Sequence, residues 1–127
     1  MKTSLRRGTY STLNLYIRPF IGNAESPDRI LLGHCPFPVS NPSKTDFNND
    51  GCMVLQDTVA NGGKTATHEV GHWFGLLHTF EGGCEGGDGV DDTPAEATAS
   101  EGCDLKRNTC PGKGYDPVEN FMDYSPG

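Results

Sequence analysis

The first half of the chain shows strand-like hydrophobic patterns. Apolar and polar residues alternate at 13–17, and a short apolar run occupies 30–33. Both segments predict strands. A third strand is predicted from Cys52 to Asp57, after a turn at Asp50–Gly51.

Polar residues separate the second and third predicted strands. The stretch from Val39 to Asn49 is rich in Ser, Asn, Pro and Asp, which predicts a loop. Asp46 begins the pattern D-x-N-x-D-G, which also opens an EF-hand calcium loop. Position twelve of such a loop would be Asp57, where the motif has glutamate, and neither flank predicts a helix. We therefore favour the turn over the calcium loop.

The pattern changes to helical spacing near the middle of the chain. Apolar residues at i, i+3, i+4 and i+7 predict one buried helix face. These residues are Val70, Trp73, Phe74 and Leu77. The same run carries His68 and His72, four residues apart, so both imidazoles project from one face and can reach one metal ion. Glu69 lies about 100° around the helix from His68. This is a poor position for a metal ligand, but it is near enough to contact a water molecule that the metal activates.

A third histidine, His78, requires the helix to end. In an unbroken helix it would lie roughly 15 Å along the axis from His68, whereas Zn–N bonds are only about 2.0–2.1 Å long. Gly75 stands where the chain has to turn, because glycine adopts left-handed backbone conformations without a β-carbon penalty. We therefore predict that Gly75 ends the helix and that His78 is the third ligand.

Three neutral imidazoles predict a catalytic zinc site. They leave the ion with its double charge and one open position, whereas structural sites are usually closed by four protein ligands. The metal would polarise a peptide carbonyl and activate a water molecule. Glu69 would take the proton from this water and pass it to the leaving amine.

Length, charge and cysteine content narrow the class of protein. The 127 residues fit one domain, and no apolar run approaches the ~18 residues of a membrane span. The net charge of −7 argues against nucleic acid and anionic membranes as partners. Five cysteines in so short a chain favour an oxidising compartment.

The segment after His78 is rich in glycine and acidic residues. Asp88, Asp91 and Asp92, together with the oxygens of Thr93, offer the hard ligands that calcium takes. A solvated loop stapled by disulfides is the alternative interpretation of this segment.

Two motifs together resemble the metzincin zinc peptidases. The run from His68 to His78 reads H-E-x-x-H-x-x-G-x-x-H, and N-F-M-D-Y at 120–124 resembles the Met-turn that completes such sites. With H-T-F at 78–80 and a Gly-Asp…Asp-Thr-Pro segment, the chain is most similar to the pappalysin (cytophagalysin-like) family. The resemblance covers the second half closely and the first half loosely.

The resemblance implies an α/β (α+β) fold, that of a metzincin-like catalytic domain. We expect a twisted mixed sheet with the active-site helix in residues 1–78, and an irregular, disulfide-stapled lower half in residues 79–127. The strand from Cys52 to Asp57 would form the exposed sheet edge along the cleft, where an extended protein or peptide substrate adds as a further strand. An interior position without a role in binding is the alternative for this strand.

The resemblance also implies roles for residues outside the zinc motif. Met122 would form an apolar floor beneath the histidines, and the Tyr124 phenol would bond the developing oxyanion or bind zinc. Members of the family carry calcium near such an acidic segment, which supports a calcium ion held by Asp88, Asp91 and Thr93.

The family pattern implies a disulfide pairing. It pairs Cys84 with Cys110, and it pairs Cys103 with a cysteine that follows the Met-turn, beyond the end of this chain. Cys35 and Cys52 are then left to pair with each other. On this interpretation the chain is a single catalytic domain, incomplete at its C-terminus, with Cys103 as a free thiol.

These observations and the resemblance lead to one expected function and one alternative. We expect a secreted, extracellular, monomeric zinc endopeptidase that acts on proteins or peptides and binds neither nucleic acid nor membrane. The alternative is a catalytically inactive, zinc-stabilised binding or regulatory fragment. Glu69 favours the enzyme, because an inactive relative would often have lost the general base. Chelator-sensitive cleavage of an unstructured protein would distinguish the two.

Overall fold

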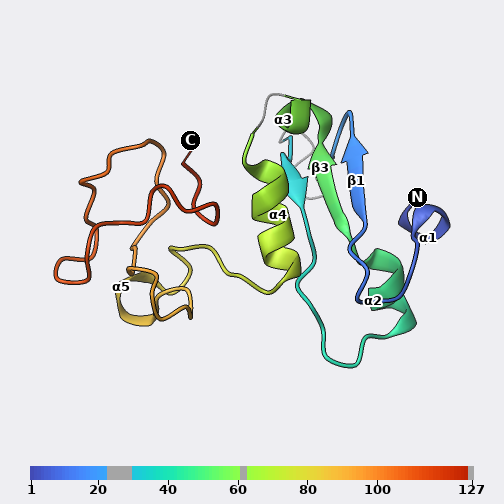
Figure 1. Cartoon of the computed structure of the whole chain (residues 1–127), viewed down its shortest axis with the longest axis horizontal. Coiled ribbons are helices and arrows are strands. Elements are labelled where there is room, and N and C mark those ends of the chain that lie inside the picture. Colours follow the sequence, from blue (N-terminus) through green and yellow to red (C-terminus); the bar gives the residue numbers. More distant parts are fainter. Residues whose placement is uncertain (23–29, 61–62, 126–127) are drawn as a thin grey trace. The chain divides into compact units, whose positions relative to one another are not determined.

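The computed structural model describes residues 1–22, 30–60 and 63–125. It divides into two compact units, Met1–Gly75 and Leu76–Gly127. The first unit contains a three-stranded sheet with helices beside it (Figure 1). In its described part, the second unit has the short helix α5 (Gly83–Gly86) among turns and bends. Among the residues described, none of the helices has the length and apolar character that crossing a membrane requires.

The sheet of the first unit is mixed, as predicted. Its strands, in spatial order, are β1 (Leu15–Arg18), β3 (Cys52–Leu55) and β2 (Gly33–His34). β1 runs parallel to β3, with Leu15 opposite Cys52. β2 runs antiparallel to β3, with Gly33 opposite Val54. Strands of both directions therefore flank β3, and its Cys52 and Val54 side chains are fully buried.

The central place of β3 corrects one prediction. The strand expected from Cys52 to Asp57 at the edge of the sheet lies between two neighbours, and the edge prediction is wrong. It also ends at Leu55, because residues Gln56–Ala60 form helix α3. Its sequence Cys-Met-Val-Leu is apolar on both faces, which is typical of an interior strand.

A short helix replaces part of the predicted loop at 39–49. Helix α2 (Lys44–Asn49) begins after Ser43, whose hydroxyl accepts the backbone N–H of Asp46 at 3.2 Å. In return, the Asp46 carboxylate accepts the backbone N–H of Ser43 at 2.8 Å. This reciprocal capping box satisfies two N–H groups that would otherwise lack partners in the first turn. The Asp46 carboxylate thus caps a helix, and the loop prediction is wrong here.

Helix α4 (Thr65–Trp73) carries the histidine motif and packs against β3 and β2 (Figure 1). Its buried residues are Glu69, Gly71 and His72. The predicted apolar face is wrong at Phe74, which is 69% exposed, and at Leu77, which is also exposed. Both residues lie beyond the last helical residue, so helical spacing no longer directs them towards the sheet.

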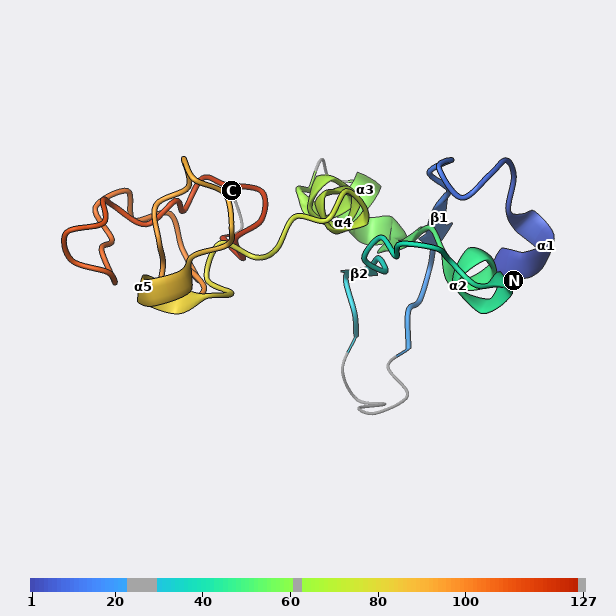
Figure 2. The ribbon, with the colours of Figure 1, turned by 90° about the horizontal axis from the view of Figure 1, so that it is seen from below.

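The end of α4 is tied to the beginning of the chain. The indole N–H of Trp73 donates to Asp50 Oδ1 at 2.8 Å, and Asp50 Oδ2 lies 2.7 Å from the guanidinium of Arg6. Arg6 follows helix α1 (Lys2–Leu5), which lies beside α2 (Figure 2). Because Arg6 and Asp50 are both buried, this ion pair anchors the helix that bears the site.

Candidate metal centre and active site

Helix α4 brings two of the predicted ligands together. The Nε2 atoms of His68 and His72 lie 3.1 Å apart, and the two rings meet edge to face. Two nitrogens bound to one tetrahedral zinc ion at about 2.05 Å would lie about 3.3 Å apart. The pair therefore has the separation that a shared zinc ion requires.

The chain leaves α4 where the sequence indicates. The backbone N–H of Phe74 donates to the carbonyls of both Val70 and Gly71, which closes the last turn. Gly75 follows with φ +94°, and its N–H donates to the His72 carbonyl at 2.9 Å. This left-handed conformation turns the chain out of the helix three residues before His78, and it favours glycine.

Glu69 lies on the side of α4 that faces the sheet. Its side chain is only 8% exposed, and the backbone N–H of Cys35 donates to its carboxylate. Burial raises the pKa of Glu69 to about 7, and the Cys35 hydrogen bond opposes this shift. Gly33 on β2 also lies against this carboxyl: a β-carbon at Gly33 would be 2.5 Å from Glu69 Oε1.

The second unit positions the third histidine through its own contacts. His78 Nδ1 lies 3.3 Å from the Glu81 carboxylate, and His78 Nε2 lies 3.2 Å from the Tyr124 hydroxyl. The His78 ring also stacks on Phe80, with 4.9 Å between ring centroids. A carboxylate on one ring nitrogen fixes the orientation of an imidazole whose other nitrogen binds metal. Sequence analysis missed Glu81, which stands three residues after the ligand.

Met122 is hydrogen-bonded to the residue that follows His78. Its side chain is 5% exposed, and its carbonyl accepts the backbone N–H of Thr79, the residue after His78, at 3.3 Å. Its own N–H donates to the Asn120 side chain at 2.9 Å. The Met-turn-like segment and the chain just after His78 are therefore hydrogen-bonded to each other, and Tyr124 joins the same group through His78.

The motif supplies three histidines, His68, His72 and His78. These three side chains are a candidate set of metal ligands among the described residues. Three neutral ring nitrogens suit zinc, and a set of three leaves one coordination position for water or substrate. The donor set therefore fits a catalytic zinc ion.

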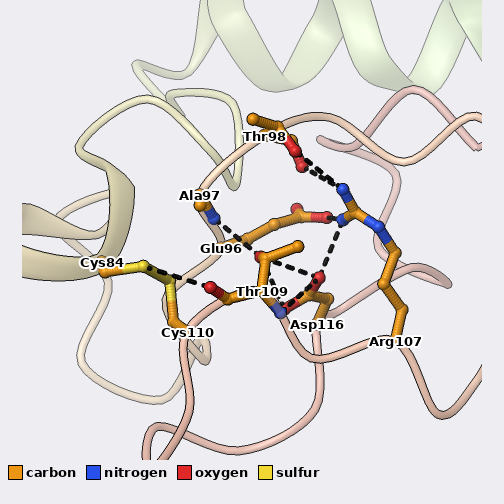
Figure 3. Close-up of a disulfide and its surroundings, with 8 residues drawn as sticks. All are labelled: Cys84, Glu96, Ala97, Thr98, Arg107, Thr109, Cys110 and Asp116. Carbon is orange, nitrogen blue, oxygen red and sulfur yellow. Dashed lines mark hydrogen bonds and ion pairs between the residues drawn. A yellow bond between two sulfur atoms is a disulfide. The ribbon is translucent and has the colours of Figure 1, made fainter.

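A buried polar network forms the centre of the second unit (Figure 3). The Arg107 guanidinium lies between the Glu96 and Asp116 carboxylates, and neither carboxylate side chain is exposed. Asp116 also accepts hydrogen bonds from the backbone and hydroxyl of Thr109, the neighbour of Cys110. This unit has little apolar core, so ion pairs and a disulfide hold the loops together.

Glu96 connects this network to the site. It accepts the Thr79 hydroxyl at 2.8 Å and the Ser100 hydroxyl at 3.0 Å. The Ser100 backbone N–H donates to Asp123, between Met122 and Tyr124. Burial raises the pKa of Glu96 above its ordinary value, and the hydrogen bonds from the Thr79 and Ser100 hydroxyls oppose this shift. Glu96 thus joins the chain after His78 to the Met-turn-like segment, a role that sequence analysis missed.

The predicted calcium residues are only partly brought together. Asp91, Asp92 and Thr93 line a cavity of about 440 Å³, together with residues of α5 and Lys113. Asp88 does not line this cavity, and its Oδ1 accepts the Val90 backbone N–H at 3.0 Å.

The structure contains both predicted disulfides. Cys35 is bonded to Cys52, which ties the chain after β2 to the beginning of β3. Cys84 is bonded to Cys110 and staples the loops of the second unit (Figure 3). Cys103 is free and exposed.

The chain is similar to fungal extracellular metalloproteases. It is 53% identical to an extracellular metalloprotease of Neurospora crassa over 135 residues, which cover 98% of this chain and 45% of that protein. It is 51% identical to extracellular metalloprotease 1 of Coccidioides posadasii, over 98% of this chain and 46% of that protein. The chain thus spans about half the length of these relatives.

Solved structures share the fold. Mature mirolysin of Tannerella forsythia, in complex with a cleaved peptide, is 33% identical and superposes with a TM-score of 0.68 over 93% of this chain and 46% of that chain. Mirolysin in complex with compound 9 gives a TM-score of 0.67 at 32% identity, over 93% of this chain and 46% of that chain. Residues 13–127 match the peptidase family M43, described as pregnancy-associated plasma protein-A. The match includes the whole histidine motif and the Met-turn-like segment, and the chain therefore belongs to the M43 (pappalysin) family of metallopeptidases.

Proposed function

We propose that the protein containing this chain is a secreted zinc endopeptidase. The observation that carries the proposal is the pair of imidazole nitrogens 3.1 Å apart on α4, with Glu69 between them in sequence and a third histidine after the helix end. The family membership and the metalloprotease relatives support it.

We infer that His68, His72 and His78 hold the zinc ion, which would supply Lewis acidity to a substrate carbonyl and to an attacking water. The Glu81 carboxylate supports this assignment, because a proton on His78 Nδ1 directed to Glu81 leaves the Nε2 lone pair available. Met122, buried next to the Thr79 backbone, supplies apolar packing and no ligand.

Glu69 is assigned the proton transfers of the reaction. Its carboxylate accepts the proton of the attacking water and then delivers it to the nitrogen of the departing amine, so one group acts as base and then as acid. Tyr124 is assigned the stabilisation of the developing oxyanion, to which its hydroxyl can donate a hydrogen bond. Its position 3.2 Å from His78 Nε2 places this hydroxyl beside a proposed ligand nitrogen.

The substrate is proposed to be an extended protein or peptide segment. β3 is interior and its neighbours are β1 and β2, so the candidate strand for added pairing is β2, which runs antiparallel to β3 beside Glu69. Main-chain pairing at a sheet edge gives affinity with little dependence on sequence. The mirolysin structure that holds a cleaved peptide supports a peptide substrate.

We propose that this enzyme acts outside the cell and as a monomer. Its relatives are named extracellular, and the two disulfides are stable in an oxidising environment. We further propose a calcium ion in the cavity lined by Asp91, Asp92 and Thr93. Calcium should then raise the melting temperature, and Asp91→Ala should remove the increase; a parent protein that shows no increase would rule the ion out.

The proposed activity is tested with the full-length protein and an unstructured protein substrate. Cleavage should stop with a zinc chelator and return with added zinc. Glu69→Gln should retain zinc and lose activity by at least ~100-fold, because only the proton transfer is removed. His72→Ala should lose the zinc itself. Near-parental cleavage by Glu69→Gln would refute the assigned mechanism, and a chelator-insensitive parent would refute the metallopeptidase.

A further inference from the structure

Gly33 occupies a position where a side chain would collide with the side chain of Glu69. A β-carbon built on Gly33 would lie 2.5 Å from both Cγ and Oε1 of Glu69, and 2.7 Å from Cδ. Real β-carbons essentially never approach other heavy atoms within 3.0 Å. The Glu69 side chain therefore fills the space that a side chain on β2 would take.

The backbone conformation does not explain this glycine. The φ of Gly33 is outside the left-handed region, and the residue lies in a regular strand opposite Val54. Glycine in a strand is destabilising relative to alanine, and a strand glycine often marks a close approach by another group. The close approach here is that of Glu69.

The strand cannot move away from Glu69 easily. β2 is paired with β3 through Gly33 and His34, and the Cys35–Cys52 disulfide fixes the next residue to the same neighbour. Cys52 is fully buried, and its Sγ lies 3.5 Å from the carbonyl oxygen of Glu69. A new methyl group at position 33 would therefore displace the flexible carboxylate rather than the backbone.

We propose that Gly33 is a positioning residue, which holds the Glu69 carboxylate in its reactive place by leaving space for it. The proposal rests on the function proposed above. β2 and the residue after it then act on Glu69 in two ways: the backbone N–H of Cys35 donates a hydrogen bond to the carboxylate, and the missing side chain at Gly33 leaves space for it. Gly33→Ala would move the carboxylate out of line with the attacking water while leaving the three histidines unchanged.

The test compares Gly33→Ala with Gly102→Ala in the full-length enzyme. A β-carbon at Gly102 meets nothing within 4 Å, and its φ is not left-handed, so this control should match the parent. Gly33→Ala should bind zinc with parental stoichiometry, lower kcat by ~100-fold and change KM by less than ~3-fold. A kcat within about twofold of the parent would overturn the proposal.

A double-mutant cycle separates positioning from general damage to the sheet. If Gly33 acts through Glu69, adding Gly33→Ala to Glu69→Gln should leave the residual rate unchanged. A residual rate lowered by the same factor as the parental rate would show an independent structural effect and refute the proposal. If the residual rate is too low to compare, a crystal structure of Gly33→Ala is the deciding measurement. The Glu69 carboxylate should no longer accept the backbone N–H of Cys35, and a retained hydrogen bond would refute the proposal. Chelator-sensitive activity of the parent tests the proposed function separately.

Discussion

Replacing Gly75 by alanine should weaken both the fold and zinc binding. Gly75 has φ +94°, and left-handed conformations are disfavoured by about 1–2 kcal/mol per residue when a β-carbon is present. A β-carbon here would be 3.5 Å from Pro38, an ordinary contact, so conformational strain is the only expected penalty. Alanine also lowers the conformational entropy of the unfolded chain, which stabilises the folded state by roughly 0.4–1 kcal/mol and offsets part of the strain. The net loss should be about 1 kcal/mol.

The same turn leads from the helix to His78, so the strain should also oppose closure of the metal site. Strain that appears only when zinc binds weakens the zinc affinity, by up to about fivefold for 1 kcal/mol, whereas strain already present in the metal-free protein lowers its stability instead. Competition with a chromogenic chelator would measure this change, and thermal unfolding of the metal-free protein would measure stability. Asparagine tolerates left-handed conformations better than alanine, so Gly75→Asn should lie between the parent and Gly75→Ala. Equal zinc affinity in all three proteins would refute the assigned role of the turn.

Two further predictions concern buried polar contacts. Arg107→Met should destabilise the protein by about 3–5 kcal/mol at pH 7, because it leaves two buried carboxylates without their cation. Unfolding at several pH values should show this deficit shrinking as the pH falls, since burial raises the pKa of Glu96 and protonation neutralises its carboxylate; a pH-independent deficit would contradict the ion-pair explanation. Trp73→Phe should lower the free energy of unfolding by about 1–3 kcal/mol, because Asp50 Oδ1 loses its hydrogen-bond donor; urea unfolding would measure this loss. The double variant Trp73→Phe/Asp50→Asn should show less than the summed losses if the two side chains are coupled.

The sequence predicts best what depends on neighbouring residues. The helix around His72 and its end at Gly75 follow from spacing and from backbone conformation, and both are local properties. Helix α2 was also predictable in principle, because Ser43 and Asp46 form a capping box; the box uses aspartate where glutamate or glutamine is usual, and the surrounding composition suggested a loop. The order of the strands is not local, and the interior place of β3 could be inferred only from its apolar character on both faces.

The network around Glu96 could not be predicted in the same way. The partners of Glu96 come from positions 4 to 17 residues away, and hydrophobic periodicity carries no information on ion pairs. One signal was present: Arg107 is the only arginine in an acid-rich segment at 76–127, and an arginine among many carboxylates predicts pairing. The choice between Glu96, Asp116 and the other carboxylates required the structure.

Gly33 and Gly75 show why residue type alone does not identify a function. Gly75 has room for a β-carbon but a left-handed φ, whereas Gly33 has an ordinary strand conformation but no room. Their alanine variants should therefore differ in what they change. Gly75→Ala acts on zinc affinity and stability and should be largely rescued by saturating zinc, because bound metal stabilises the strained turn. Gly33→Ala acts on kcat, and added zinc cannot rescue it, since the displaced group is the carboxylate and no ligand has moved.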